Sequence, residues 1–308
     1  SMRFPIVIGA ILLVLVAAGA GFWQMTAPDP LGAGALPAHQ ADAEHGKWVF
    51  HAAGCGSCHA DPKAEGDDRY LLGGGVALTS AFGTFHAPNI SPGPEGIEGW
   101  TDLDFVNAVL RGVSPDGAHY YPSFPYPSYQ RMRVEDALDL KAFIDTLPPV
   151  ATPSPEHELP ALFRIRRGIG LWKRIFMDRA PFLPGEDASP EIQHGAYLAT
   201  ALGHCTECHT PRDRLGGPIM DRYLAGGPSP EDPSKTVPNI TPHADGIGDW
   251  SIKDITDALR TGFLPGFETF GGSMVAVQKN MAELSDEDRE AIAAYLKAVP
   301  PLPNRSKD

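Results

Sequence analysis

Two five-residue segments constrain this chain more than any other feature of its sequence. Residues 55–59 read C-G-S-C-H, and residues 205–209 read C-T-E-C-H. Two thiols three positions apart share one face of a helix, so both can add to the vinyl groups of one porphyrin, with the next histidine beneath its iron. A zinc centre with four thiolate ligands would not require that adjacent histidine. The sequence therefore predicts two covalently bound haem c groups, held by Cys55, Cys58, His59, Cys205, Cys208 and His209.

These segments use all four cysteines of the 308-residue chain, so no thiol is left for a disulfide or a free nucleophile. Haem attachment of this kind takes place outside the cytoplasm, and the absence of disulfides is therefore no argument for a cytosolic protein. The formal net charge of −13 argues against nucleic acid as a partner. The 33 glycines and 31 prolines indicate many loops and few long regular elements.

The N-terminus has the character of a membrane segment. No charged residue interrupts the apolar run from Phe4 to Trp23, which matches the roughly 20 residues that a helix needs to cross a bilayer. Arg3 precedes the run, which predicts a single-pass anchor in the cell inner membrane with the haem domains on the periplasmic side. A cleaved signal peptide is the alternative, because alanines near the end of the run offer small residues for a cleavage site. The length of the run and its aromatic boundary favour the uncleaved anchor.

The rest of the chain repeats itself. The haem segments recur from residue 55 to residue 205, P-N-I recurs from 88–90 to 238–240, and L-P-P has its counterpart in V-P-P. Matches in one order over a period this long indicate a tandem pair of domains rather than a solenoid. Capping patterns at residues 101–104 and 251–254 each start a middle helix, and the last helices cover about 135–147 and 286–299.

The predicted fold class is all-α, with two tandem cytochrome c domains of the class I type, long loops and one N-terminal transmembrane helix. Residues 151–189 contain a basic amphipathic segment, which predicts either a helix that clamps the two domains together or one that lies on anionic lipid or a partner subunit. The clamp is the favoured interpretation. The predicted parts are the anchor 1–23, a flexible linker 24–41, domain 1 at 42–150, the connector 151–189, domain 2 at 190–303 and a tail 304–308.

A haem iron with one histidine needs a second axial ligand or keeps an open site. Met132 is the one methionine of the first predicted domain and lies just before its last helix, so we expect it to be the distal ligand. The second domain offers Met281, favoured by its spacing to the last helix, and Met274, which follows two glycines that allow a close turn of the backbone. Spacing alone leaves this choice open.

Two smaller features bear on the haem surroundings. Pro88 and Pro238 could each offer a carbonyl to the outer nitrogen of the proximal histidine, and a plain turn is an equal alternative. Arg111 and Arg260 could pair with haem propionates, or could be surface residues near a helix end.

The sequence resembles the multi-haem cytochrome c subunits of membrane-bound dehydrogenases that face the periplasm and oxidise alcohols, gluconate and related sugars and acids. The resemblance covers residues 43–303 and implies that Met132, in Y-Q-R-M, and Met274, in G-G-S-M, are the distal ligands, so that iron is held by His59, Met132, His209 and Met274. Many such subunits carry three haem domains, whereas this chain has two haem segments. The matching segments are A-P-N-I-S-P, L-R-G-V-S-P-D-G-A-H-Y-Y-P-S-F-P-Y-P-S-Y-Q-R-M, H-G-A-Y-L-A-T-A-L-G-H-C-T-E-C-H, V-P-N-I-T-P and G-G-S-M-V-A-V.

The expected function is electron transfer without a catalytic site of its own. Haems with His/Met ligation accept and pass on single electrons, and the protein holds them near each other and near a partner's cofactor. We expect the chain to connect a periplasmic dehydrogenase or another donor with a respiratory acceptor, either a terminal oxidase or another cytochrome. A dihaem subunit of a haem–copper oxidase is the alternative. A dihaem peroxidase is less favoured, because the G-G-S-M segment provides a distal methionine.

Overall fold

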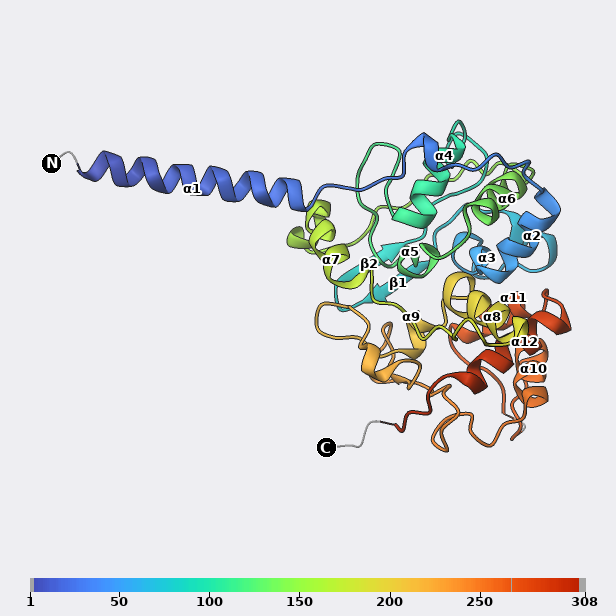
Figure 1. Cartoon of the computed structure of the whole chain (residues 1–308). Helices are drawn as coiled ribbons and strands as arrows, with labels where there is room; N and C mark the ends of the chain where they lie inside the picture. The colour runs from blue at the N-terminus through green and yellow to red at the C-terminus, as the bar shows by residue number, and fades with distance from the viewer. Residues whose placement is uncertain (1–2, 267, 305–308) are drawn as a thin grey trace.

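The computed structural model describes residues 3–266 and 268–304. One long helix projects from a body of short helices and long loops (Figure 1). That helix, α1, covers Arg3–Met25, and its apolar part Ile6–Met25, with a mean hydropathy of 2.5, is not buried. By length and composition α1 could cross a membrane, and an N-terminal signal sequence would have the same character.

A first group of helices follows, and its middle and last helices lie where the sequence predicts them. Helix α4 is capped by Thr101, whose hydroxyl accepts a hydrogen bond from the Asp104 N–H while the Asp104 carboxylate accepts one from the Thr101 N–H. The group comprises α2 (Ala43–Ala52), α3 (Cys55–His59), the antiparallel pair β1 (Ala77–Ser80) and β2 (Gly83–His86), α4 (Asp102–Val106) followed by a π-helix (Asn107–Arg111), α5 (Tyr126–Tyr129) and α6 (Val134–Ile144).

A second group repeats this order. Ser251 and Ser285 form the same capping arrangement with Asp254 and Asp288. The group comprises α8 (Pro190–Tyr197) followed by a π-helix (Leu198–Leu202), α9 (Thr206–His209), the short antiparallel pair β3 (Gly227–Pro228) and β4 (Thr236–Val237), α10 (Ile252–Thr261), α11 (Met274–Met281) and α12 (Asp286–Ala298). The two short strand pairs are an addition to the predicted helices.

In both groups the first helix crosses the last at a glycine. A Cβ atom on Gly46 of α2 would lie 1.9 Å from the Asp139 carbonyl oxygen of α6, and one on Gly195 of α8 would lie 1.8 Å from the Ala291 carbonyl oxygen of α12. Only a residue without a side chain allows the two backbones to approach so closely. The same crossing therefore fixes the core of each group.

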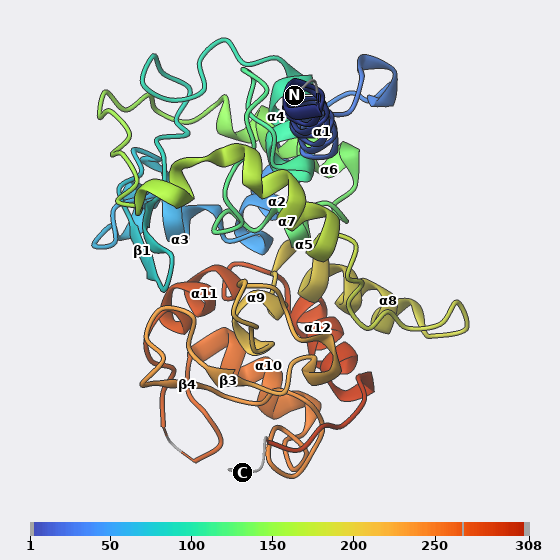
Figure 2. The same cartoon turned by 90° about the vertical axis from the view of Figure 1, so that its left-hand side faces the viewer.

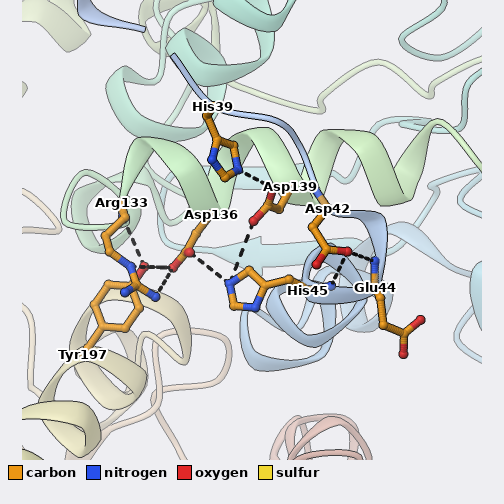
Figure 3. Close-up of polar contacts among 8 residues, drawn as sticks. All are labelled: His39, Asp42, Glu44, His45, Arg133, Asp136, Asp139 and Tyr197. Atoms are coloured by element: carbon orange, nitrogen blue, oxygen red, sulfur yellow. Dashed lines mark hydrogen bonds and ion pairs between the residues drawn. The ribbon is translucent and has the colours of Figure 1, made fainter. Parts of the chain in front are cut away.

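The two groups lie side by side (Figure 2), and reciprocal side-chain hydrogen bonds join them. The indole N–H of Trp48 in α2 donates to Asp288 of α12, at 2.8 Å, and the hydroxyl of Tyr197 in α8 donates to Asp136 of α6. Figure 3 shows Asp136 between His45 on one side and Arg133 with Tyr197 on the other. Because each contact has its counterpart with the groups exchanged, the interface has the form of a two-fold related pair.

The segment predicted as a flexible linker is fastened to the first group. The Leu31 N–H donates to the Asn107 side chain at 2.6 Å, and that side-chain amide donates back to the Leu31 carbonyl at 3.1 Å. His39 contacts the buried carboxylate of Asp139 at 2.6 Å. A composition rich in Ala, Pro and Gly predicts flexibility in isolation, but these side-chain contacts are made by residues distant in the sequence.

Helix α7 (Ile169–Phe176), in the connector, lies beside the end of α1 (Figures 1 and 2). The Arg167 side chain donates to the Trp23 carbonyl, and its guanidinium lies 3.9 Å from the centre of the Trp23 ring. Lys173 donates to the Gly112 carbonyl of the first group at 2.8 Å, and Trp172 donates to the Leu215 carbonyl of the second at 2.9 Å. The connector thus touches α1 and both groups.

Candidate haem sites

Each haem segment forms a single helical turn with its histidine held from outside the turn. The Nδ1 atom of His59 lies 2.8 Å from the Pro88 carbonyl oxygen, and Nδ1 of His209 lies 2.8 Å from the Pro238 carbonyl oxygen. The predicted role of the two prolines is confirmed. This contact fixes the orientation of the ring and leaves Nε2 as the nitrogen for a metal.

Burial sets the protonation of these groups. It lowers the pKa of His59 and of His209, against the opposing effect of the proline carbonyls, and so favours the neutral imidazole that can ligate iron. Burial also raises the pKa of the Cys55 and Cys205 thiols to about 12. None of the four cysteines takes part in a disulfide, as the sequence predicts. Paired thiols on one turn, a neutral imidazole and apolar surroundings are the donor set that haem c requires.

The three candidate distal methionines differ in their place in the fold. Met132 is 4% exposed and lies two residues before the start of α6. Met274 is half-buried and is the first residue of α11. Met281 is the last residue of α11. A Cβ atom built on Gly203 would lie 3.7 Å from the Met281 methyl group and 3.8 Å from the Ala52 carbonyl oxygen of the first group. Met281 therefore packs at the boundary between the two groups.

The aromatic loop before Met132 lines the first site. Tyr129 is buried, and its hydroxyl donates to the carbonyl of Ala53 at 2.7 Å. Ala53 lies two residues before Cys55, the first residue of the first haem segment. Its ring lies 5.9 Å from that of Phe124 and 5.6 Å from that of His204, which precedes Cys205. The loop thus borders both haem segments.

The haem segments themselves take part in the interface. Asn280 of α11 donates to the Ser57 hydroxyl at 2.6 Å, and Ser128 of α5 donates to the Glu207 carboxylate at 2.8 Å. Ser57 and Glu207 are the middle residues of the two C-x-x-C-H segments. Both sites therefore face the boundary between the groups.

Other side-chain contacts add to the sequence analysis. Arg111 pairs with Asp29 of the linker, and Arg260 pairs with Asp257 of its own helix, in keeping with the surface position that the sequence left open beside a haem propionate contact. The reciprocal contacts at Asp136 and Asp288 were not predicted. A comparison of the two repeats position by position would have pointed to them, because His45 and His194 occupy equivalent places in α2 and α8.

Comparisons with known proteins agree with this architecture. A predominantly helical fold with two haem-attachment segments defines a c-type cytochrome, and the cytochrome c family model matches residues 192–300. A protein of Cereibacter sphaeroides named diheme cytochrome c-type is 47% identical over 94% of this chain and 96% of its own length. The chain belongs to the family of dihaem c-type cytochromes, which carry covalently bound haem c and transfer electrons without a catalytic site of their own.

Two further relatives are subunits of larger complexes. The fructose dehydrogenase cytochrome subunit of Gluconobacter japonicus is 36% identical over 97% of this chain, and the gluconate 2-dehydrogenase cytochrome c subunit of Pantoea cypripedii is 33% identical over 85% of it. The chain spans 60% of the length of each of these two subunits.

Proposed function

We propose that this chain is a membrane-anchored dihaem cytochrome that relays single electrons from a periplasmic dehydrogenase, or another donor, to a respiratory acceptor such as a terminal oxidase or another cytochrome. The observation that carries the proposal is the pair of equivalent sites, each with two thiols on one turn and a histidine held by a proline carbonyl at 2.8 Å. Relatives named as dehydrogenase cytochrome subunits support a dehydrogenase as the donor.

The proposed organisation is two tandem cytochrome c domains, at 42–150 and 190–303, behind the anchor 1–23. The shared element order, the matching glycine crossings at Gly46 and Gly195 and the matching capping residues support this division. Helix α1 would hold the domains at the periplasmic face of the cell inner membrane, since its length suits a bilayer span.

The proposed iron ligands are His59 and Met132 for the first haem, and His209 and Met274 for the second. When bound, haem supplies reversible one-electron chemistry. The residues of the chain favour the neutral form of the imidazoles and orient them through the carbonyls of Pro88 and Pro238.

The relay can be tested in membranes of a strain that lacks the protein. Oxygen uptake driven by an alcohol, fructose or gluconate is compared with and without the full-length chain, and with a Cys205→Ala, Cys208→Ala variant that cannot attach the second haem. We expect one of these activities to require the wild-type chain and to be lost with the variant. Uptake that is unchanged for every substrate, while the purified chain carries two haems, would reject the proposed donors.

A further inference from the structure

The end of α1 is fastened to the connector, and this contact fixes how far α7 lies from the apolar helix. The apolar part of α1 ends at Met25, whose carbonyl accepts a hydrogen bond from the Arg174 side chain. Thr26 is fully buried, and its hydroxyl accepts a hydrogen bond from Arg167 at 3.0 Å. A Cβ atom on Gly170 of α7 would lie 2.4 Å from the Thr26 carbonyl oxygen. Helix α7 therefore lies at the level where the apolar span ends.

The connector exposes apolar side chains at this level. Leu171 and Ile175 are four residues apart and share one face of α7, and Leu162 and Ile165 precede that helix. These four residues, which we call the connector patch, are 41–73% exposed. Phe176 is buried, so α7 already has a packed side. A helix on the surface of a soluble domain normally presents polar residues to water, whereas this one presents leucine and isoleucine.

Helix α7 lies on the face of the body from which α1 projects. Figure 1 shows it at the edge beside the end of α1, and in Figure 2, where α1 is seen nearly end-on, α7 lies across the same face. Trp23, in the last turns of α1, is 64% exposed and is the residue type that gathers at membrane interfaces. A bilayer crossed by α1 would therefore lie against the connector patch.

The charge of the connector suits an anionic surface. Residues 159–177 contain five basic side chains and no acidic one, in a chain of net charge −13. Lys173 is directed into the first group, where it donates to the Arg111 and Gly112 carbonyls. The hydrogen bonds donated by the other four, within residues 3–266 and 268–304, go to backbone carbonyls or the Thr26 hydroxyl and none to a carboxylate. Their positive charges thus stay available to phosphate headgroups.

We propose that the connector patch inserts into the interface of the bilayer that α1 crosses, and that the arginines beside it bind the headgroups of anionic phospholipid. This inference rests on the proposed membrane anchor. Lipid is favoured over a protein partner, because a protein would have to fit between this face and the bilayer. The body is then held at two places, α1 and the connector patch. Since Lys173 joins α7 to the first group, this attachment also sets the orientation of the haem-bearing groups relative to the membrane.

The test uses the full-length holoprotein in lipid nanodiscs that contain a phospholipid with a photoreactive diazirine in its acyl chain. Mass spectrometry maps the label after irradiation, and label in residues 161–176 is expressed relative to label in α1. With phosphatidylglycerol nanodiscs we expect both segments to be labelled. When phosphatidylcholine replaces phosphatidylglycerol, label in residues 161–176 should fall several-fold while label in α1 stays the same.

A double variant, Leu171→Ser with Ile175→Ser, removes the apolar face of α7. We expect its label in residues 161–176 to fall several-fold, because serine does not partition into the acyl region. Ile252→Ser is the matched control: Ile252 is 41% exposed and is the first residue of α10, which lies on the side of the body away from α1 in Figure 1. This control should leave the label in residues 161–176 unchanged, and residues 252–261 should carry none.

Wild-type label confined to α1 would overturn the proposal whatever the variants show, because the connector patch would then not touch lipid. Equal label in residues 161–176 in the two lipids would overturn the role given to the arginines. Failure of the proposed anchor is a different result, since α1 itself would then carry no label. Haem content, measured in each variant, shows whether the fold is intact.

Discussion

Two buried aspartates each take part in polar contacts between the groups. Asp288 contacts His194 at 2.7 Å and accepts from Trp48 at 2.8 Å, while Asp136 contacts His45 at 3.1 Å and accepts from Tyr197. A buried carboxylate is costly unless its oxygens are hydrogen-bonded, so each aspartate depends on residues of both groups.

The Asp288 carboxylate should make stability depend on pH. Burial raises its pKa, but hydrogen bonds from His194, Trp48 and Ser285 outweigh burial and hold the pKa below its ordinary value. The stabilisation is therefore present above the unfolded pKa, about 3.9, and is lost as the pH falls through the lowered value in the folded protein.

We expect Asp288→Asn to destabilise the protein by about 1–3 kcal/mol at neutral pH, because hydrogen-bond partners of a buried group are lost. Urea unfolding of the holoprotein from pH 6 down to about pH 3 measures the effect. The difference between wild type and variant should shrink toward the acid end. A difference that stays constant with pH would contradict the assigned role.

At the scale of elements, the glycine crossings decide how closely the first and last helices pack. Gly46→Ala would place a methyl group 1.9 Å from the Asp139 carbonyl oxygen, so α2 and α6 would have to separate. Overpacking of this kind costs about 1–3 kcal/mol or more. Thermal unfolding should show a lower midpoint for Gly46→Ala than for the control Gly32→Ala, which has open space around its Cβ. Equal midpoints would argue against a tight crossing.

The contact between α1 and α7 is the second element-level feature. Arg167→Ala removes both the hydrogen bond to the Trp23 carbonyl and the stacking of the guanidinium on the Trp23 ring. A cation–π contact contributes about 0.5–2 kcal/mol. We expect the amides of residues 26–31 to exchange hydrogen faster in the variant, measured in lipid nanodiscs. Ala replacement of Arg214, an exposed residue of the second group, is the control and should leave the exchange rates of this segment unchanged.

At the scale of the whole molecule, the two groups share one continuous apolar core. The buried cluster includes Val49 and Phe50 of α2 together with Leu202 and Ile292 of the second group. Elements that share a core unfold together. We expect haem absorbance and far-ultraviolet circular dichroism to report one coincident thermal transition for the holoprotein. Two separated transitions would mean that the groups are independent units.

Features set by a few neighbouring residues could be predicted from the sequence. The capping residues Thr101 and Ser251, the helical turns that carry the cysteines, and the apolar run of α1 all follow from local spacing and composition. The choice between Met274 and Met281 could not be made from spacing, because loop length does not fix where a side chain packs.

The sequence by itself predicted two haem-attachment turns and an apolar helix long enough to span a bilayer, because these features depend on residues close together in the chain. Only the tertiary structure decided that the linker is fastened to the first group and that Trp48 and Tyr197 join the groups reciprocally. These features depend on contacts between residues far apart in the chain, and such contacts exist only once the two groups have packed together.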